Sequence, residues 1–173
     1  MRLFLKAVCA SIILAITAGV CSCSGYRLGG AKPEELREIQ LIYLPMVSNK
    51  TQEIKLASQA TNSLVRFINN DGAFQVSTPA QSDATLRVVI EKIDYREFRS
   101  SRLDTLRAEE LTATISATWQ LVDNQSKVLL AGRSNGETRF FIDDNQRLSR
   151  DNAMYDAIDN LSRKIASRIS NGF

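Results

Sequence analysis

The stretch LTATISATWQL, residues 111–121, alternates strictly between apolar and polar side chains. One parity carries Leu111, Ala113, Ile115, Ala117, Trp119 and Leu121, and the other carries Thr112, Thr114, Ser116, Thr118 and Gln120. Successive side chains of a β-strand point to opposite faces, so this pattern is typical of a strand with one buried and one solvated face. Antiparallel sheets commonly face water on one side. The stretch therefore predicts an antiparallel sheet with a polar outer face.

Further strands are predicted on both sides of this stretch. The sequence DNQS, residues 123–126, is rich in turn formers and leads into a returning strand over 127–141. Residues 84–98 are also strand-like. Their apolar side chains change parity, from Leu86, Val88 and Ile90 to Ile93 and Tyr95. Because one extra residue in a strand reconciles the two parities, we expect a β-bulge near Glu91 and Lys92.

Two segments have the periodicity of amphipathic helices. The face of the first consists of Ala57, Ala60, Thr61, Leu64, Val65 and Ile68. Gly72 can end this helix in the left-handed conformation, and Asn49 or Thr51 is expected to cap its start. The face of the second consists of Met154, Ile158, Leu161, Ile165 and Ile169. Ser149 is the predicted N-cap of this last helix.

The order of these elements predicts the fold class. Apolar runs at 39–45 and 73–78 add short strands before and after the first helix. We expect an α/β chain of the α+β two-layer type, with two helices packed on one face of a four-stranded, mixed but mostly antiparallel sheet. Residues 39–173 are long enough to form this as a single domain with its own core.

The N-terminal segment has the features of a secretory signal peptide. Arg2 and Lys6 give it a basic start, and an uncharged, mostly apolar run follows over 7–20. This run is shorter than the roughly 20 apolar residues that a membrane-spanning helix needs. We therefore predict a signal peptide over 1–22.

The cysteines indicate how the mature chain begins. Cys21 and Cys23 are too close in sequence for an unstrained disulfide, and a metal site lacks further ligands because the chain contains no histidine. Val20-Cys21-Ser22-Cys23 instead fits a bacterial lipobox, which makes Cys23 the lipidated first residue. More than one acyl chain gives durable membrane anchoring. With no aspartate after Cys23, the outer membrane is favoured, and residues 23–38 become a lipidated tether.

Catalytic arrangements are scarce in this sequence. Without histidine, nucleophile–histidine pairs and histidine-ligated metal centres are excluded. The adjacent acidic pairs Glu109–Glu110 and Asp143–Asp144 do not form natural acid–base pairs, because neighbouring strand residues point to opposite faces. We expect no enzyme activity and no cofactor. The chain has 22 Lys and Arg against 19 Asp and Glu, and two of the basic residues lie in the signal peptide, so charge does not favour nucleic acid.

Basic residues gather at two places in the predicted fold. Arg96, Arg99, Arg102 and Arg107 surround the predicted hairpin of 96–107, and Arg147 and Arg150 precede the last helical face. Guanidinium groups bind phosphate in bidentate fashion, so these residues suit a phosphorylated lipid. Interspersed acidic residues equally suit a solubilising loop, and both interpretations stay open from spacing alone.

Several stretches together resemble the LptE-type lipopolysaccharide-assembly lipoprotein family. They are CSGYRLG (23–29), IYLPMVSNKT (42–51), DGAFQV (71–76), SDATLRVVIEKI (82–93) and RLSRDNAMYDAIDNLSRKI (147–165). Ser24 and Cys21 depart from the family pattern. The resemblance implies two helices on a four-stranded sheet, an acylated (palmitate-bearing) anchor at Cys23, and a lipoprotein on the periplasmic side of the outer membrane.

The resemblance also implies partners and site residues. Family members plug and help assemble the LptD-type outer-membrane β-barrel and bind lipopolysaccharide, so Arg99, Arg102 and Arg150 become candidate lipopolysaccharide-binding residues here. The polar parity of 112–118 suits a polar barrel lumen, and it suits plain solvent equally well. The alternatives are a periplasm-facing structural or ligand-binding lipoprotein of another envelope complex and an envelope hydrolase, which would need a cleft with perturbed carboxylates.

Overall fold

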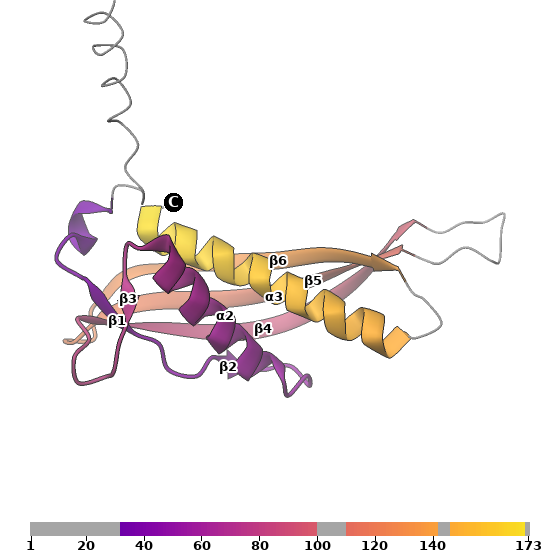
Figure 1. Ribbon diagram of the computed structural model, residues 1–173, viewed down its shortest axis with the longest axis horizontal. Helices are drawn as coiled ribbons and strands as arrows, with labels where there is room; N and C mark the ends of the chain where they lie inside the picture. The colour runs from indigo at the N-terminus through magenta and orange to yellow at the C-terminus, as the bar shows by residue number, and fades with distance from the viewer. Residues whose placement is uncertain (1–31, 100–109, 142–145, 172–173) are drawn as a thin grey trace, which may run out of the picture.

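The computed structural model describes residues 32–99, 110–141 and 146–171. Figure 1 shows the long helices lying across one face of the sheet, whose long strands extend beyond them at one end. In chain order the elements are the 3-10 helix η2 (Glu34–Leu36), β1 (Leu41–Tyr43), β2 (Ser48–Asn49), α2 (Leu56–Asp71), β3 (Gln75–Val76), β4 (Ala84–Arg99), β5 (Glu110–Asp123), β6 (Val128–Phe141) and α3 (Gln146–Asn171).

The sheet is mixed, as predicted. Its strands lie in the order β3-β1-β4-β5-β6, with β2 paired to β4 off this path. The pairs β4–β5 and β5–β6 are antiparallel, whereas β1 and β2 run parallel to β4 and β3 runs parallel to β1. The prediction of four strands in the sheet is too low. β3 lies within the short strand predicted over 73–78 and belongs to the sheet, and β2, a strand of two residues, was not predicted. Strands this short leave no periodic signal in a sequence.

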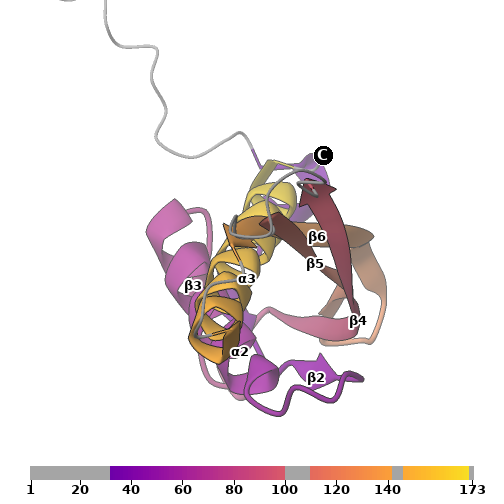
Figure 2. The ribbon, with the colours of Figure 1, turned by 90° about the vertical axis from the view of Figure 1, so that its right-hand side faces the viewer.

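The two helices cover one face of the sheet and enclose the core. Figure 2 shows α2 and α3 side by side on one side of the curled sheet. The predicted inward parity of β5 is buried from Ala113 to Leu121, whereas Leu111 is only half-buried. All five residues of the predicted last helical face are buried. The predicted α+β arrangement is thus confirmed.

No helix among the described residues is long and apolar enough to cross a membrane.

The predicted β-bulge is present in β4. The register with β5 shifts between Ile90 and Lys92, so that Ile93 lies opposite Ile115 and Tyr95 lies opposite Ala113. Because Ala113 and Ile115 are fully buried, the bulge turns Tyr95 toward the helices. Without the bulge, the Tyr95 side chain would lie on the polar outer face of the sheet.

The helix ends agree with the sequence only in part. The residue after α2, Gly72, has φ 77°, the left-handed conformation that glycine adopts without steric cost. Both predicted N-caps are wrong. Lys55 occupies the N-cap of α2 without a side-chain hydrogen bond. Asn49 lies upstream at the end of β2, and Thr51 lies in the loop after it. Ser149 lies within α3, which already includes Gln146.

The helix and sheet layers approach each other closely at Gly136 of β6. A Cβ atom built there would lie 2.0 Å from the Ala157 carbonyl oxygen and 2.7 Å from the Leu161 Cβ, both in α3. The absence of a side chain therefore lets the α3 backbone approach the sheet.

Polar side chains of α3 also cover the outer edge of β6. Arg168 Nη1 donates to the Arg133 carbonyl at 2.6 Å, and Lys164 Nζ donates to the Asn135 carbonyl at 2.9 Å. Unpaired backbone groups on an edge strand invite pairing with other chains. These two hydrogen bonds occupy carbonyl groups of that edge and hold α3 in place.

We predict that Gly136→Ala lowers the free energy of unfolding by about 3 kcal/mol, since α3 must move to admit the methyl group. A loss of stability would be informative, because replacing glycine by alanine inside a strand normally stabilises the protein. Chemical denaturation measures the effect. Asn135→Ala, next to it on the opposite face, is the control and should change stability by less than about 0.5 kcal/mol. Equal stability of Gly136→Ala and wild type would contradict the close approach.

Candidate functional site

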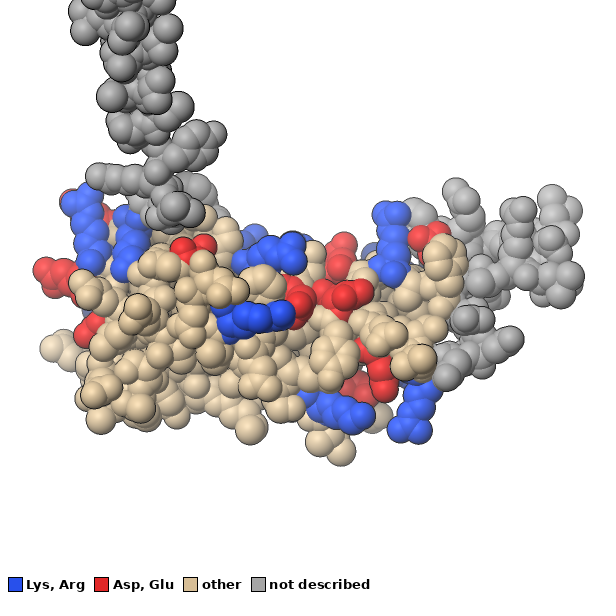
Figure 3. All heavy atoms as spheres, in the orientation of Figure 1, with Lys and Arg blue, Asp and Glu red and all other residues tan. Residues whose placement is uncertain are grey.

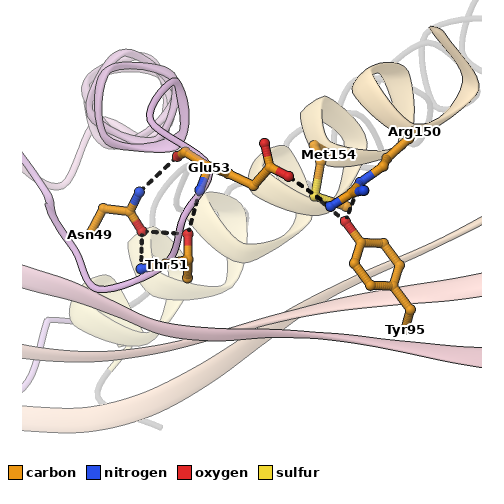
Figure 4. A network of polar contacts seen from close by, with 6 residues as sticks. All are labelled: Asn49, Thr51, Glu53, Tyr95, Arg150 and Met154. Atoms are coloured by element: carbon orange, nitrogen blue, oxygen red, sulfur yellow. Dashed lines mark hydrogen bonds and ion pairs between the residues drawn. The ribbon is translucent and has the colours of Figure 1, made fainter. Parts of the chain in front are cut away.

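The loop before α2 is organised by its own side chains. The Asn49 Oδ1 atom accepts hydrogen bonds from the Thr51 amide at 2.9 Å and the Thr51 hydroxyl at 2.8 Å. The Asn49 Nδ2 atom donates to the Glu53 carbonyl at 2.8 Å, and the Glu53 amide donates to the Thr51 hydroxyl at 3.3 Å. Figure 4 shows that these bonds hold Glu53 with its carboxylate directed toward α3. The residues expected to cap α2 thus position an acidic side chain.

Arg150 of α3 connects this loop to the sheet (Figure 4). Its Nη2 atom donates to Glu53 Oε1 at 2.7 Å, and its Nε atom donates to the Tyr95 hydroxyl at 2.9 Å. The guanidinium carbon also lies 4.9 Å from the centre of the Tyr95 ring. One arginine therefore ties together α3, β4 and the loop before α2.

Tyr95 is itself held from two further directions. Its hydroxyl donates to the Met154 sulfur at 3.7 Å, so it accepts from Arg150 and donates to the core. Its ring meets the Phe140 ring edge to face, with centroids 6.5 Å apart and planes at 78°. These contacts fix the Tyr95 ring and hydroxyl in position beside the Arg150 guanidinium.

A hollow of about 600 Å³ lies beside Arg150. It is lined by Gln52, Glu53, Ile54, Lys55, Arg147, Arg150 and Asp151, and we call it the Arg150 hollow. Among the residues that the structure describes, neither Lys55 nor Arg147 forms a salt bridge. Figure 3, drawn from the helix side, shows basic and acidic side chains intermingled over the surface. The unpaired cations make the hollow suitable for an anion despite this mixed charge.

Ligand access to Arg150 is open. The side chain keeps 48% of its surface exposed, and that of Glu53 keeps 43%. Exposed ion pairs contribute at most about 1 kcal/mol, so an incoming anion can replace Glu53 at low cost. A phosphate group offers the guanidinium a bidentate partner of higher charge than a carboxylate. The arrangement can therefore bind a phosphate group, with Glu53 as an internal competitor.

The structure places two of the three arginines that were predicted to contact lipid. Arg150 lies at the centre of the Arg150 hollow. Arg99 ends β4 opposite Glu110, four residues beyond Tyr95, which is about 13 Å along a strand. Arg102 lies outside the described residues, as does the predicted lipidation site Cys23.

Sequence reasoning missed the residues that position Arg150. Tyr95 could have been found, because the predicted bulge turns it inward. No sequence pattern indicates Glu53, because it lies 97 residues from Arg150 and contacts it only through the packing of the helices.

A second polar cluster fastens α2 to α3. Arg66 Nη2 donates to both Asp159 carboxylate oxygens, at 2.6 and 2.7 Å, and the Ser63 hydroxyl donates to one of them at 2.6 Å. Partial burial raises the pKa of Asp159, but the hydrogen bonds from Ser63 and Arg66 and the nearby positive charge leave that pKa below its usual value. With its charges already paired, this cluster serves the packing of the helices.

The outer face of the sheet holds a third polar cluster around Glu91. Lys50 Nζ contacts Glu91 Oε2 at 2.7 Å, and the Thr118 hydroxyl donates to Oε1 at 3.0 Å. The bond from Lys50, with that from Thr118, lowers the pKa of Glu91. A general acid needs the opposite shift, so this carboxylate is not suited to acid catalysis. The described residues contain no group of metal ligands either.

Known structures share the fold at low sequence identity. A minor lipoprotein of Acinetobacter baumannii has a TM-score of 0.53 at 16% identity, covering 76% of this chain and 91% of that chain. An uncharacterized lipoprotein B of Nitrosomonas europaea has a TM-score of 0.52 at 18% identity, with 84% and 90% covered. PelC L103M of Paraburkholderia phytofirmans, a dodecamer, has a TM-score of 0.51 at 13% identity, with 83% and 94% covered. At these identities the likeness concerns the fold alone.

Sequence comparison identifies the family. No curated protein matches the chain. The family model described as LptE, lipopolysaccharide-assembly, matches residues 39–171, from just before β1 to the end of α3. Because this match covers most of the chain, the protein belongs to the LptE family of lipopolysaccharide-assembly proteins.

Proposed function

We propose that this protein is an outer-membrane lipoprotein that plugs and helps assemble an LptD-type β-barrel and binds lipopolysaccharide during its insertion into the outer leaflet. The observation that carries the proposal is the family match over 39–171. The Arg150 hollow adds a site of suitable chemistry, because lipopolysaccharide carries phosphate groups.

A lipid anchor at Cys23 is part of the proposal. Residues 1–22 act as the signal peptide and 23–38 as the tether that joins the acylated cysteine to the domain of 39–173. The lipobox-like Val20-Cys21-Ser22-Cys23 supports this division. Two proteins of similar fold are themselves named as lipoproteins. The anchor would hold the domain on the periplasmic side of the outer membrane.

Arg150 is the centre of the proposed lipopolysaccharide site. A phosphate of the ligand replaces Glu53 on the guanidinium, while the Tyr95 hydroxyl and ring keep Arg150 oriented. Lys55 and Arg147 lie in the same hollow and add positive charge. Arg99 and Arg102, at the end of β4 and beyond it, extend the basic region toward the hairpin in this proposal.

The plug role is supported by the outer face of the sheet. Thr114 and Ser116 line a hollow of about 600 Å³ on this face, together with charged side chains of both signs. Barrel lumens are polar, so a face of this composition can lie against a barrel wall without burying apolar surface. The helices and the core then need not rearrange on assembly.

Purification of the full-length, tagged protein from detergent-solubilised outer membranes tests the plug role. We expect a large β-barrel to co-purify in comparable amount, because a plug shares an extensive surface with its barrel. Another outer-membrane lipoprotein carrying the same tag is the control. Recovery without any large barrel, or with a different envelope complex, would reject the plug and favour the alternative of a lipoprotein of that complex.

The arginine assignment predicts that Arg99→Gln combined with Arg150→Gln weakens lipopolysaccharide binding by about tenfold, the effect of losing one or two charge-assisted phosphate contacts. Glutamine is preferred to glutamate, which would repel Glu53. Arg87→Gln, an exposed arginine in the first half of β4, is the matched control. Binding should be titrated with lipopolysaccharide in detergent. Equal affinities of the double variant and the control would reject these arginines as ligand contacts.

A further inference from the structure

We propose that the Arg150 hollow binds an acyl chain of its ligand as well as a phosphate, with Ile54 as the principal apolar contact and Leu148 as a secondary one. The ligand class is an acylated sugar phosphate of the lipopolysaccharide type. This inference rests on the proposed function and specifies how its site recognises the ligand.

Ile54 is the main observation. Its side chain is 90% exposed, although it lies in a loop fixed by the Asn49 and Thr51 hydrogen bonds. It also lines the Arg150 hollow. The backbone of a firmly held loop does not have to be ordered when a ligand covers its apolar side chain, which lowers the cost of binding. Ile54 is therefore preorganised for an apolar partner.

The neighbours of Ile54 indicate what that partner is. Ile54 is followed in sequence by Lys55, and Arg147 of α3 is followed by Leu148, which is 56% exposed. Both basic residues line the hollow without a salt bridge to any described residue. Ile54 lines the hollow, and Leu148 is the sequence neighbour of a residue that lines it, so each of two separate segments carries an exposed apolar residue next in sequence to a cation. An acylated sugar phosphate has the complementary pattern, with hydrocarbon chains attached close to an anionic group.

Other exposed apolar residues lack this arrangement. Met46 is 70% exposed and Val128 is 50% exposed, but neither lines a hollow that also holds Arg147 or Arg150. Val128 begins β6, at the opposite end of that strand from the start of α3. Exposure alone therefore does not define the site, and Val128 provides a matched control.

The test compares Ile54→Gln with Val128→Gln on two probes: lipopolysaccharide in detergent, and the same lipopolysaccharide deacylated with its phosphates retained. We expect Ile54→Gln to weaken lipopolysaccharide binding by about tenfold, as for the loss of one large buried apolar contact. It should leave the affinity for the deacylated ligand unchanged. Leu148→Gln should have a smaller effect in the same direction, and Val128→Gln should have none. Thermal unfolding should be unchanged in all three variants because these side chains are exposed.

Four outcomes would overturn the inference. Unchanged lipopolysaccharide affinity of Ile54→Gln, with Arg99→Gln/Arg150→Gln still weakened, removes the acyl contact and leaves the proposed function standing. Equal weakening on both probes shows that Ile54 does not contact an acyl chain. Ile54-dependent binding to phosphatidylglycerol vesicles that equals binding to lipopolysaccharide assigns the residue to a general membrane surface. If the wild type binds neither probe, the proposed function fails together with the inference.

Discussion

The close approach of α3 to β6 at Gly136 is the constraint on which the rest of the structure depends. A helix backbone that lies against a strand backbone cannot rotate or slide without a large loss of packing, so Gly136 fixes the line that α3 follows over the sheet. The hydrogen bonds of Lys164 and Arg168 to the β6 carbonyls fix the same line from the side. The first turns of α3 are then carried to Tyr95 of β4, where Arg150 meets its partners.

The sequence predicted those parts of the fold that depend on periodicity within one element. The alternation in 111–121, the helical face of 57–68 and the bulge near Glu91 all have this origin, and each is found in the structure. The two-residue strand β2 has no such signal, because its formation depends on β4 beside it. Asn49 is a residue type that favours helix caps, yet it ends β2 and its side chain bonds to the loop that follows.

The candidate site was predictable to the extent of one residue. Arg150 was selected from charge and from family resemblance, whereas Glu53 and Tyr95 become its neighbours only through tertiary packing. The consequence is functional. In the proposed site, a half-exposed arginine with a carboxylate competitor would bind an anion reversibly, which suits the transient lipid contact that we propose. Ile54 would add selectivity for acylated ligands without strengthening the electrostatic attraction.

The central claim is that lipopolysaccharide contacts the end of the molecule that carries the Arg150 hollow. Site-specific photocrosslinking of the full-length protein in outer membranes tests it most directly, with a photoreactive residue placed at position 147 or, as a reference, at position 87 on β4. The account predicts a lipopolysaccharide adduct from position 147 and none from position 87. Adducts from position 87 alone, or from neither position while lipopolysaccharide is being exported, would contradict it.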